Sequence, residues 1–260
     1  MTDDGLTIEQ TGEVVHLTLS RPKQRNALTI ALAGNLADAI SDHRSARAIV
    51  ITGAPPAFCA GGDLDDLLPE AKRGAAHATQ TIYGQFHRVV LAIASASGPV
   101  IAAINGPALG AGFDLAMACD LRLASSDATF ASSWIHMGLV PGMGGAFTLP
   151  ILIGSTRAAE LLLTGRRCSV QQAFEWGLVN EVVDPNDLSQ RVSEWASEIV
   201  ALDAQAVART KESLRRGIDE GLSRELATLG AVQGGLLSGE GFSSAVARFK
   251  QRSAERPTAS

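Results

Sequence analysis

The sequence is poor in the residues that build metal centres and disulfide frameworks. It has three cysteines and five histidines in 260 residues, and Cys59, Cys119 and Cys168 lie far apart along the chain. Disulfide-rich domains and zinc sites need more cysteines, or cysteines at short fixed spacings. No group of His, Cys and Asp has metal-binding spacing either. We therefore expect no metal ion and a reducing, cytoplasmic location.

An excess of positive charge and a long apolar run are also missing. The 22 Lys and Arg residues stand against 27 Asp and Glu, a formal net charge of −5, which argues against a nucleic-acid partner. No run of about 18 apolar residues could span a membrane. The acidic N-terminal stretch MTDDGLTIEQ lacks the apolar core of a signal peptide. We therefore expect neither nucleic acid nor a membrane as partner.

The motifs of several common enzyme classes are absent. The chain contains no G-x-S-x-G, no H-E-x-x-H and no Walker A pattern. Gly110 and Gly112 follow a predicted strand, as the first glycines of a dinucleotide-binding turn do, but Leu115 replaces the third glycine. Asp114 would also lie close to the pyrophosphate. A dinucleotide cofactor is therefore not expected.

What the sequence does contain is an alternation of strand and helix patterns. Apolar residues make up 46% of the chain, enough for a sizeable core. The alternation continues to about residue 184 and indicates repeated βαβ units with a mostly parallel sheet. The predicted strands are 14–20, 46–54, 99–107, 120–125 and 128–133, and the predicted helices are 30–44, 77–96 and one that begins near Gly112.

The pattern changes near residue 186. From there the apolar residues recur at helical spacing, and no strand pattern is present. We therefore divide the chain into an α/β core (1–185) and a helical C-terminal region (186–260). The helical region is expected to pack on the core or on a neighbouring subunit.

Two turns of small residues follow two of the predicted strands. One is AFCAGGDLDDL (57–67) and the other lies within AINGPALGAGFDL (103–115). The first N–H groups of a helix have no partner within the helix, and the helix dipole adds positive charge there. Such turns suit a phosphate or a developing oxyanion. The residues alone are equally consistent with two ordinary tight turns.

Several stretches of the chain match known signatures in combination. They are AFCAGGDL, INGPALGAGFDLAMACDLRLAS, GLVPGMGG and LLLTGRRCSVQQAFEWGLVNEVV, with RPKQRNAL (21–28) as an early loop. Together they resemble the enoyl-CoA hydratase/isomerase (crotonase) superfamily over about residues 8–252. The resemblance implies a spiral of ββα units with a helical C-terminal trimerisation region. It also implies an acyl-CoA thioester as ligand, no cofactor beyond the coenzyme A of the substrate, and a homotrimer or a dimer of trimers.

The resemblance assigns roles to both turns. It implies that the backbone N–H groups of Ala60 and Ala111 hold the thioester oxygen, and that Asp114 matches the first of two catalytic glutamates. The alternative for Asp114 is a first-turn acid that only stabilises the helix dipole. The first turn is also expected to supply substrate contacts, although Asp63 equally suits a helix cap. These contacts are Gly62, Asp63 and Leu64.

The second catalytic glutamate is missing. Its position matches Trp134, whose indole cannot move a proton at neutral pH, and the acid that dienoyl-CoA isomerases and chlorobenzoyl-CoA dehalogenases use falls on Gly142. The dehalogenases resemble this chain in having a tryptophan at the Trp134 position. Trp134 is therefore expected to line an acyl pocket for a flat or bulky group, or else to be a core aromatic. His136 and Tyr83 are the candidates to replace the glutamate.

Cations are needed for the coenzyme phosphates. The resemblance places Lys23 and Arg25 in this role, and it matches Phe249 and Arg252 to C-terminal residues that contact the coenzyme, often from an adjacent subunit. The expected activity is that of an enoyl-CoA hydratase or isomerase. An isomerase, lyase or hydrolase with a single acid/base residue, and a non-catalytic acyl-CoA-binding protein, remain alternatives.

Overall fold

A seven-stranded sheet forms the centre of the computed structural model, which describes residues 2–3 and 5–254. The strand order is β1-β2-β3-β4-β5-β7-β10. β1 to β3 are antiparallel, and each neighbouring pair from β3 to β10 is parallel, as predicted. The strands are β1 Thr2–Asp3, β2 Leu6–Thr11, β3 Val14–Leu19, β4 Ala48–Gly53, β5 Val100–Ile104, β7 Leu121–Ser125 and β10 Glu181–Val183.

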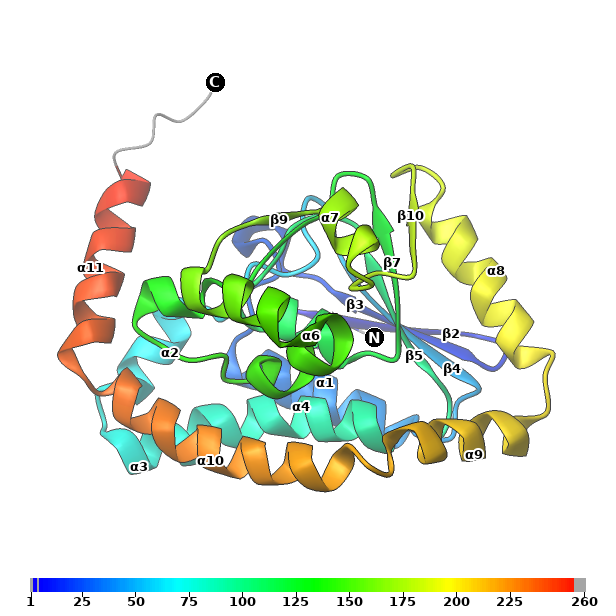
Figure 1. The fold of residues 1–260 in the computed structure, drawn as a ribbon, viewed down its shortest axis with the longest axis horizontal. Coiled ribbons are helices and arrows are strands. Elements are labelled where there is room, and N and C mark those ends of the chain that lie inside the picture. Colours follow the sequence, from blue (N-terminus) through cyan, green and yellow to red (C-terminus); the bar gives the residue numbers. More distant parts are fainter. Residues whose placement is uncertain (1, 4, 255–260) are drawn as a thin grey trace.

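Helices cover both faces of the parallel strands. α1 (Ile30–Asp42) and α4 (Gly84–Ser95) pack against each other over the main hydrophobic core. α8 (Leu188–Val200) covers a smaller apolar cluster on the other face (Figure 1). β5 is buried along its whole length. Burial on two faces explains why the strands read as continuous apolar runs rather than as alternating patterns.

A second, three-stranded sheet joins segments that are distant in the sequence. It has the order β6-β8-β9, with β6 and β8 parallel and β9 antiparallel to β8. An isolated bridge adds Cys59 beside Ala108. The expected strand 128–133 is shorter than predicted, because residues Ser133–Met137 form a 3-10 turn. The strands are β6 Ala108–Leu109, β8 Thr129–Ala131 and β9 Cys168–Ser169.

The predicted long helix 77–96 is interrupted. It consists of α3 (Ala75–Ala78), a π-helical turn at Thr79–Tyr83, and α4. At this turn, the Thr79 hydroxyl donates a hydrogen bond to the Gly230 carbonyl of another helix (2.7 Å). A π-helical turn rotates the side chains that follow it relative to a continuous α-helix, and such turns are frequent at functional sites.

α6 (Gly145–Thr164) is the one helix, within residues 2–3 and 5–254, that is long and apolar enough to qualify as a membrane span. It is broken at Gly154, where φ is 77° and ψ is 158°. Each half is therefore too short for a hydrocarbon core about 30 Å thick, at about 1.5 Å per residue. The short helix α7 (Val170–Glu175) follows it.

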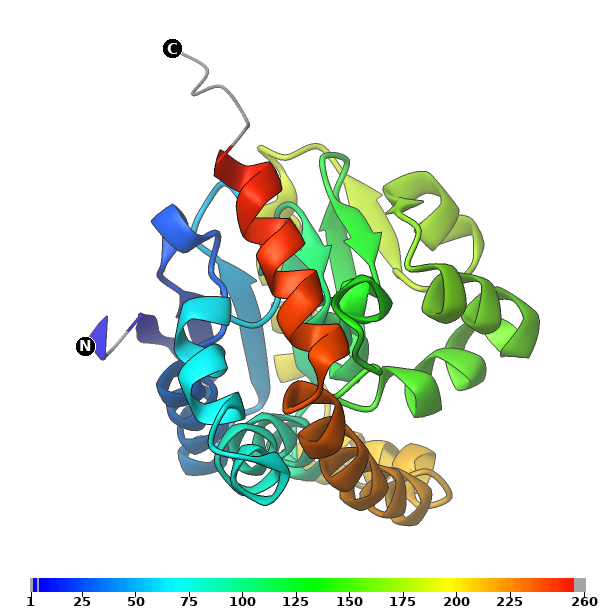
Figure 2. The same ribbon diagram turned by 90° about the vertical axis from the view of Figure 1, so that its left-hand side faces the viewer.

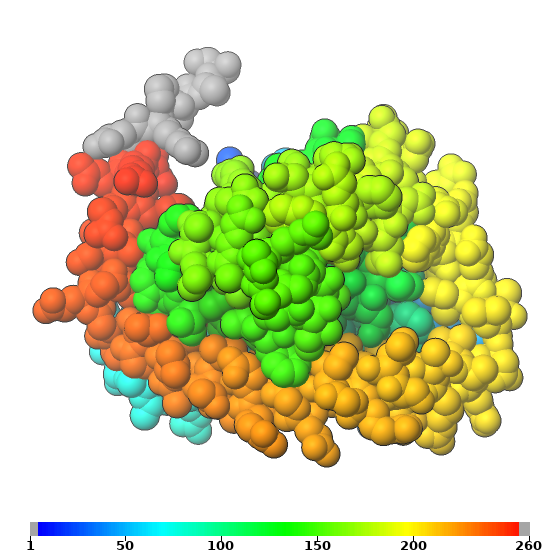
Figure 3. All heavy atoms as spheres, in the orientation of Figure 1, coloured from blue at the N-terminus to red at the C-terminus, as the bar shows by residue number. Residues whose placement is uncertain are grey.

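The chain after β10 is helical, as predicted, in the part that the structure describes. Figure 2 shows α11 between α2 and the Ser133–Met137 turn, which it contacts. In Figure 3, α9 and α10 form a band along one edge of the molecule. The proposed division at residues 185–186 stays a prediction, and residues 255–260 lie outside the described residues. The helices named here are α2 Leu64–Ala71, α9 Ala204–Arg215, α10 Asp219–Leu237 and α11 Glu240–Ala254.

Candidate active site

The two turns of small residues lie side by side. The Cys59 N–H donates to the Pro107 carbonyl (3.1 Å), and the Leu109 N–H donates to the Cys59 carbonyl (2.9 Å). This parallel pairing brings Gly61 level with the start of α5 (Ala111–Ala118). A Cβ atom at Gly61, whose φ is +110°, would lie 3.1 Å from the Leu109 oxygen and 3.7 Å from the Ala111 nitrogen. Only glycine therefore permits the two turns to approach this closely.

The predicted donor at Ala60 is wrong, because its N–H group is already used. It donates to the Arg25 carbonyl (2.9 Å), and the N–H of Asp63 donates to the Leu28 carbonyl (2.8 Å). Leu28 and Gly62 form an isolated parallel bridge, and in this pattern the N–H of Gly62 faces away from Leu28. Among the described residues, the Gly62 N–H has no hydrogen-bond partner.

Ala111 fits its predicted place as the first residue of α5. Its N–H belongs to the unpaired first turn of the helix, and no described group accepts a hydrogen bond from it. Gly110 before it has a φ of +53°, a conformation that favours glycine. The structure thus leaves two amides free, from Gly62 and Ala111, on turns that touch each other.

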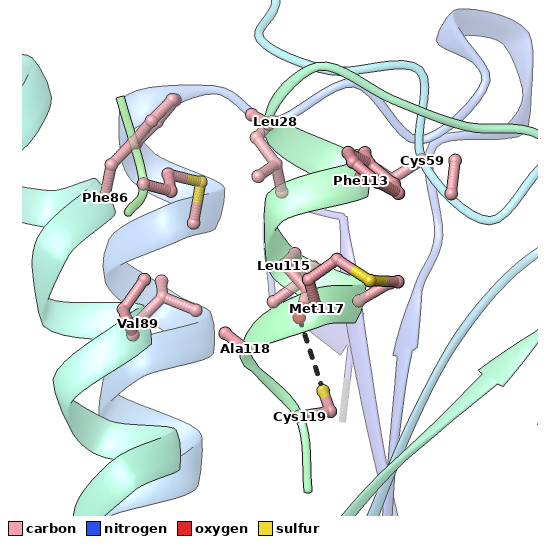
Figure 4. Packing of buried hydrophobic residues seen from close by; sticks show 14 of the residues in the cluster. Leu28, Cys59, Phe86, Val89, Phe113, Leu115, Met117, Ala118 and Cys119 are labelled. Carbon is pink, nitrogen blue, oxygen red and sulfur yellow. Dashed lines mark hydrogen bonds between the residues drawn. The ribbon is translucent and has the colours of Figure 1, made fainter. Parts of the chain in front are cut away.

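α5 carries Asp114 into the interior, because every residue of this helix is buried. Figure 4 shows Phe113, Leu115 and Met117 of α5 among core side chains, with Phe86 and Val89 on the neighbouring α4. Asp114 is 1% exposed. A carboxyl held this deeply on a packed helix has a fixed position and a strongly altered titration.

Burial raises the pKa of Asp114 to about 7, although the backbone amides of Met143 and Gly145 and the Trp134 indole act in the opposite direction. The Met143 N–H donates to Asp114 Oδ2 (3.2 Å). Within the described residues, Oδ1 is buried without a hydrogen-bond partner. The carboxyl can therefore hold or release a proton near neutral pH, and one of its oxygens is unoccupied.

Trp134 lies against Asp114, and His136 does not. The Trp134 indole lowers the pKa of Asp114, but the pair lacks hydrogen-bond geometry, and Trp134 Nε1 is another buried atom without a partner in the described structure. Trp134 also belongs to the main hydrophobic core, so both of its predicted roles remain open. His136 is exposed and bonds to the Gly165 carbonyl (3.0 Å). Its predicted place in the site is not supported.

Tyr83 lies within electrostatic reach of Asp114, and Gln233 bonds to Tyr83. The Asp114 charge helps to raise the pKa of Tyr83, although burial is the larger cause. Gln233 on α10 is fully buried and donates from Nε2 to the Tyr83 hydroxyl (2.8 Å). The sequence analysis did not select Gln233. Its only sequence signal is a polar residue among the apolar positions of a predicted helix.

The carboxylate of Asp63 has structural partners. It accepts from the Asp65 N–H (3.1 Å) as the cap of α2, and it forms an ion pair with Arg21 (2.8 Å). These contacts favour the helix-cap alternative over substrate binding. Leu64 begins α2 and packs on the main core.

The predicted coenzyme-binding residues lie on two segments near these turns. Lys23 and Arg25 belong to an exposed loop, which is fastened to the first turn through the Arg25 carbonyl. Phe249 and Arg252 are exposed on α11, and the neighbouring Lys250 forms an ion pair with Asp65 in the first turn of α2. In the described residues no group of His, Cys, Asp and Glu could hold a metal ion.

Comparisons with known proteins point to one family. The model of the family described as enoyl-CoA hydratase/isomerase matches residues 9–254. A 4-chlorobenzoyl coenzyme A dehalogenase of Arthrobacter sp is 32% identical over 226 residues, which cover 85% of this chain and 81% of the relative. A short-chain-enoyl-CoA hydratase of Clostridium acetobutylicum is 31% identical, covering 96% and 95%. The crystal structure of an enoyl-CoA hydratase/isomerase from Mycobacterium paratuberculosis superposes with a TM-score of 0.88 at 33% identity, covering 95% and 98%.

Proposed function

The chain belongs to the enoyl-CoA hydratase/isomerase family, and on this premise we propose that it binds an acyl-CoA thioester and moves a proton at the α-carbon of the acyl group. One observation carries the proposal. The buried Asp114 carboxyl, with a pKa of about 7, lies in the same first helical turn as the free Ala111 amide. A group poised near neutral pH beside an oxyanion donor is suited to general acid–base catalysis.

The proposed oxyanion donors are the N–H groups of Gly62 and Ala111. Removal of an α-proton, or attack at the β-carbon, places negative charge on the thioester oxygen. Two converging amides stabilise that charge, and the dipole of α5 adds to the effect. Losing one such donor typically costs about 3 kcal/mol of transition-state stabilisation. The free state of both amides and the contact between their turns support this assignment.

Asp114 is the proposed acid and base. Its carboxylate accepts a proton and returns it to another carbon in an isomerase. In a hydratase it takes the proton from water and delivers it to the α-carbon. Because Trp134 stands where a second carboxyl is expected, one group must perform both steps. This favours an isomerase, lyase or hydratase that works with a single carboxyl.

The remaining assignments are extensions of this proposal. Lys23, Arg25 and Arg252 hold the coenzyme phosphates, and Phe249 packs on the coenzyme, because both segments lie beside the turns. The chain assembles as a homotrimer or a dimer of trimers. A cytoplasmic location stays a prediction.

The test is a panel of enoyl-, aryl- and 3-oxoacyl-CoA thioesters incubated in D2O and followed by mass spectrometry. We expect deuterium incorporation or conversion with the wild-type protein, and a loss of about a hundredfold or more for Asp114→Asn. Asp114→Glu is the matched control, since it keeps the carboxyl and should retain measurable exchange. Binding of many thioesters without exchange or turnover would favour the non-catalytic alternative instead.

A further inference from the structure

Arg25 and Asn26 have an unusual backbone conformation. They are the two non-glycine residues of the described chain with a positive φ, 50° and 58°. This conformation costs free energy in a residue with a side chain, so the surrounding contacts must hold it in place. Asn26 is also fully buried, although most asparagines are exposed. The proposed function gives this residue no role so far.

The Asn26 side chain forms three hydrogen bonds to the backbone. Its Oδ1 accepts from the Arg21 N–H (2.9 Å), and its Nδ2 donates to the carbonyls of Ala54 and Ala57 (2.7 Å each). A Cβ atom at Gly53 would lie 2.7 Å from this nitrogen, so only glycine leaves room for the contact. Asn26 therefore fastens its loop to the end of β4 and to the turn of small residues that follows.

Backbone groups on either side of Asn26 bond to the same turn. The Arg25 carbonyl accepts from the Ala60 N–H (2.9 Å), and the Leu28 N–H donates to the Gly61 carbonyl (2.7 Å). The Gly61 carbonyl and the Gly62 N–H belong to one trans peptide unit, so they point in opposite directions. The bond from Leu28 therefore fixes the direction of the Gly62 N–H. It also polarises the peptide, which strengthens this N–H as a donor.

We propose that Asn26 is a positioning residue, which holds Leu28 against the turn and thereby aims the Gly62 N–H at the thioester oxygen. The inference rests on the proposed function, because the Gly62 amide is one of the two proposed oxyanion donors. Asn26 itself contacts no reacting atom. Without its three bonds the strained backbone at Arg25 and Asn26 relaxes, and the Gly62 amide loses its fixed direction.

Three variants separate this role from a purely structural one. Asn26→Asp keeps the size and the acceptor of the side chain but turns an oxygen toward the two carbonyls. Asn26→Gly removes all three bonds and still permits a positive φ. Lys211→Met is the matched control, because the Lys211 ammonium also donates to two buried carbonyls, those of Ile93 and Gly98 (3.0 Å each). Gly98 precedes β5, whereas Ala54 follows the parallel β4, so the control lies at the other end of the strands.

The first measurement uses 4-(dimethylamino)cinnamoyl-CoA, whose absorption band moves to longer wavelength when its thioester carbonyl is polarised. At saturation we expect the band shift in wild type and in Lys211→Met, and about half of it or less in both Asn26 variants. The second measurement is kcat and KM for the thioester of the panel that the wild type converts fastest. In the Asn26 variants kcat should fall by about tenfold to a hundredfold while KM changes by less than about threefold, because an aimed donor acts on the transition state.

An unchanged band shift and kcat in the folded Asn26 variants would overturn the inference and leave the proposed function intact. An equal loss in Lys211→Met would overturn it too, and so would Asn26 variants that both fail to fold where Lys211→Met folds, since either result marks a purely structural role. If the wild type converts thioesters but does not bind the cinnamoyl probe, the kcat comparison decides. A wild-type protein that neither polarises nor converts any thioester refutes the proposed function itself.

Discussion

Asp114 is a first-turn carboxyl of a helix and is also buried, and these two properties act on its pKa in opposite directions. A first-turn carboxylate is stabilised by the helix dipole when it is exposed, but α5 is buried along its whole length, and desolvation dominates. The Met143 and Gly145 amides lower the pKa only in part. The result is a carboxyl whose pKa is near neutral rather than near 3.8, the usual value for an aspartate.

This titration predicts how stability depends on pH. The folded protein holds the Asp114 proton up to about pH 7, whereas the unfolded chain releases it near 3.8. The stabilising contribution is therefore complete below the unfolded pKa and is lost as the pH rises through the folded pKa. The difference in unfolding free energy between wild type and Asp114→Asn should shift against wild type by up to about 4 kcal/mol from pH 4 to pH 8.

Urea denaturation of both proteins at a series of pH values measures this shift, because contributions from all other groups cancel in the difference. If the wild type became more stable relative to Asp114→Asn as the pH rose, this would contradict the direction assigned to the Asp114 pKa shift. A difference that stayed constant would mean that Asp114 titrates alike in both states.

At the scale of elements, the sequence predicts which segments are strands and helices better than it predicts how they pair. The pattern around residues 57–64 indicates an exposed-amide turn, but it does not tell which amide is free. That depends on the pairing of Leu28 with Gly62 and on the Arg25 carbonyl, which are contacts between distant segments. Once the pairing is known, the free amide is that of Gly62 rather than that of Ala60.

Two other features escape the sequence for the same reason. The helix 77–96 has an unbroken apolar spacing, yet it contains the π-helical turn at Thr79–Tyr83, where Thr79 bonds to α10. Gln233 belongs to the site only because α10 lies along this turn. Local periodicity carries no information on either contact.

α9 allows a prediction about how a helix is fastened to the core. Lys211 is buried, pairs with Asp120 (2.7 Å), and donates to the carbonyls of Ile93 and Gly98. Without the Lys211 ammonium, Asp120 keeps, among the described residues, only Arg215 as a cationic partner (3.2 Å), and the two buried carbonyls lose this donor. We expect Lys211→Met to lower the free energy of unfolding by about 2 kcal/mol.

The matched control lies on the same helix. Arg209 is exposed and pairs with Glu212 in solvent, so Arg209→Met should cost less than about 1 kcal/mol. Both variants are compared by thermal or urea unfolding at one pH. Equal effects at the two positions would show that Lys211 does not anchor α9.

At the scale of the whole molecule, the sheet and the change to helices near residue 186 follow from patterns that are local and repeated. Buried parallel strands read as continuous apolar runs, and amphipathic helices repeat their spacing over several turns. The sequence does not show whether an apolar residue packs within its own subunit or against another subunit. Leu163 on α6 is 74% exposed and Leu214 on α9 is 72% exposed.

These two leucines lead to a prediction about assembly. In the proposed assembly, exposed leucines on helices are the side chains that we place on a surface covered by another copy. In light scattering coupled to size exclusion, we expect the wild-type protein to have three or six times the 27.1 kDa mass of the chain. Leu163→Glu and Leu214→Glu place a charge in that surface and should shift the protein toward monomer, because an unpaired charge in an interface is strongly disfavoured.

Gln10→Glu, which adds the same charge on the exposed part of β2, should leave the mass unchanged. A monomeric wild type at micromolar concentration, or assembly that tolerates both glutamates, would place these leucines outside any subunit interface.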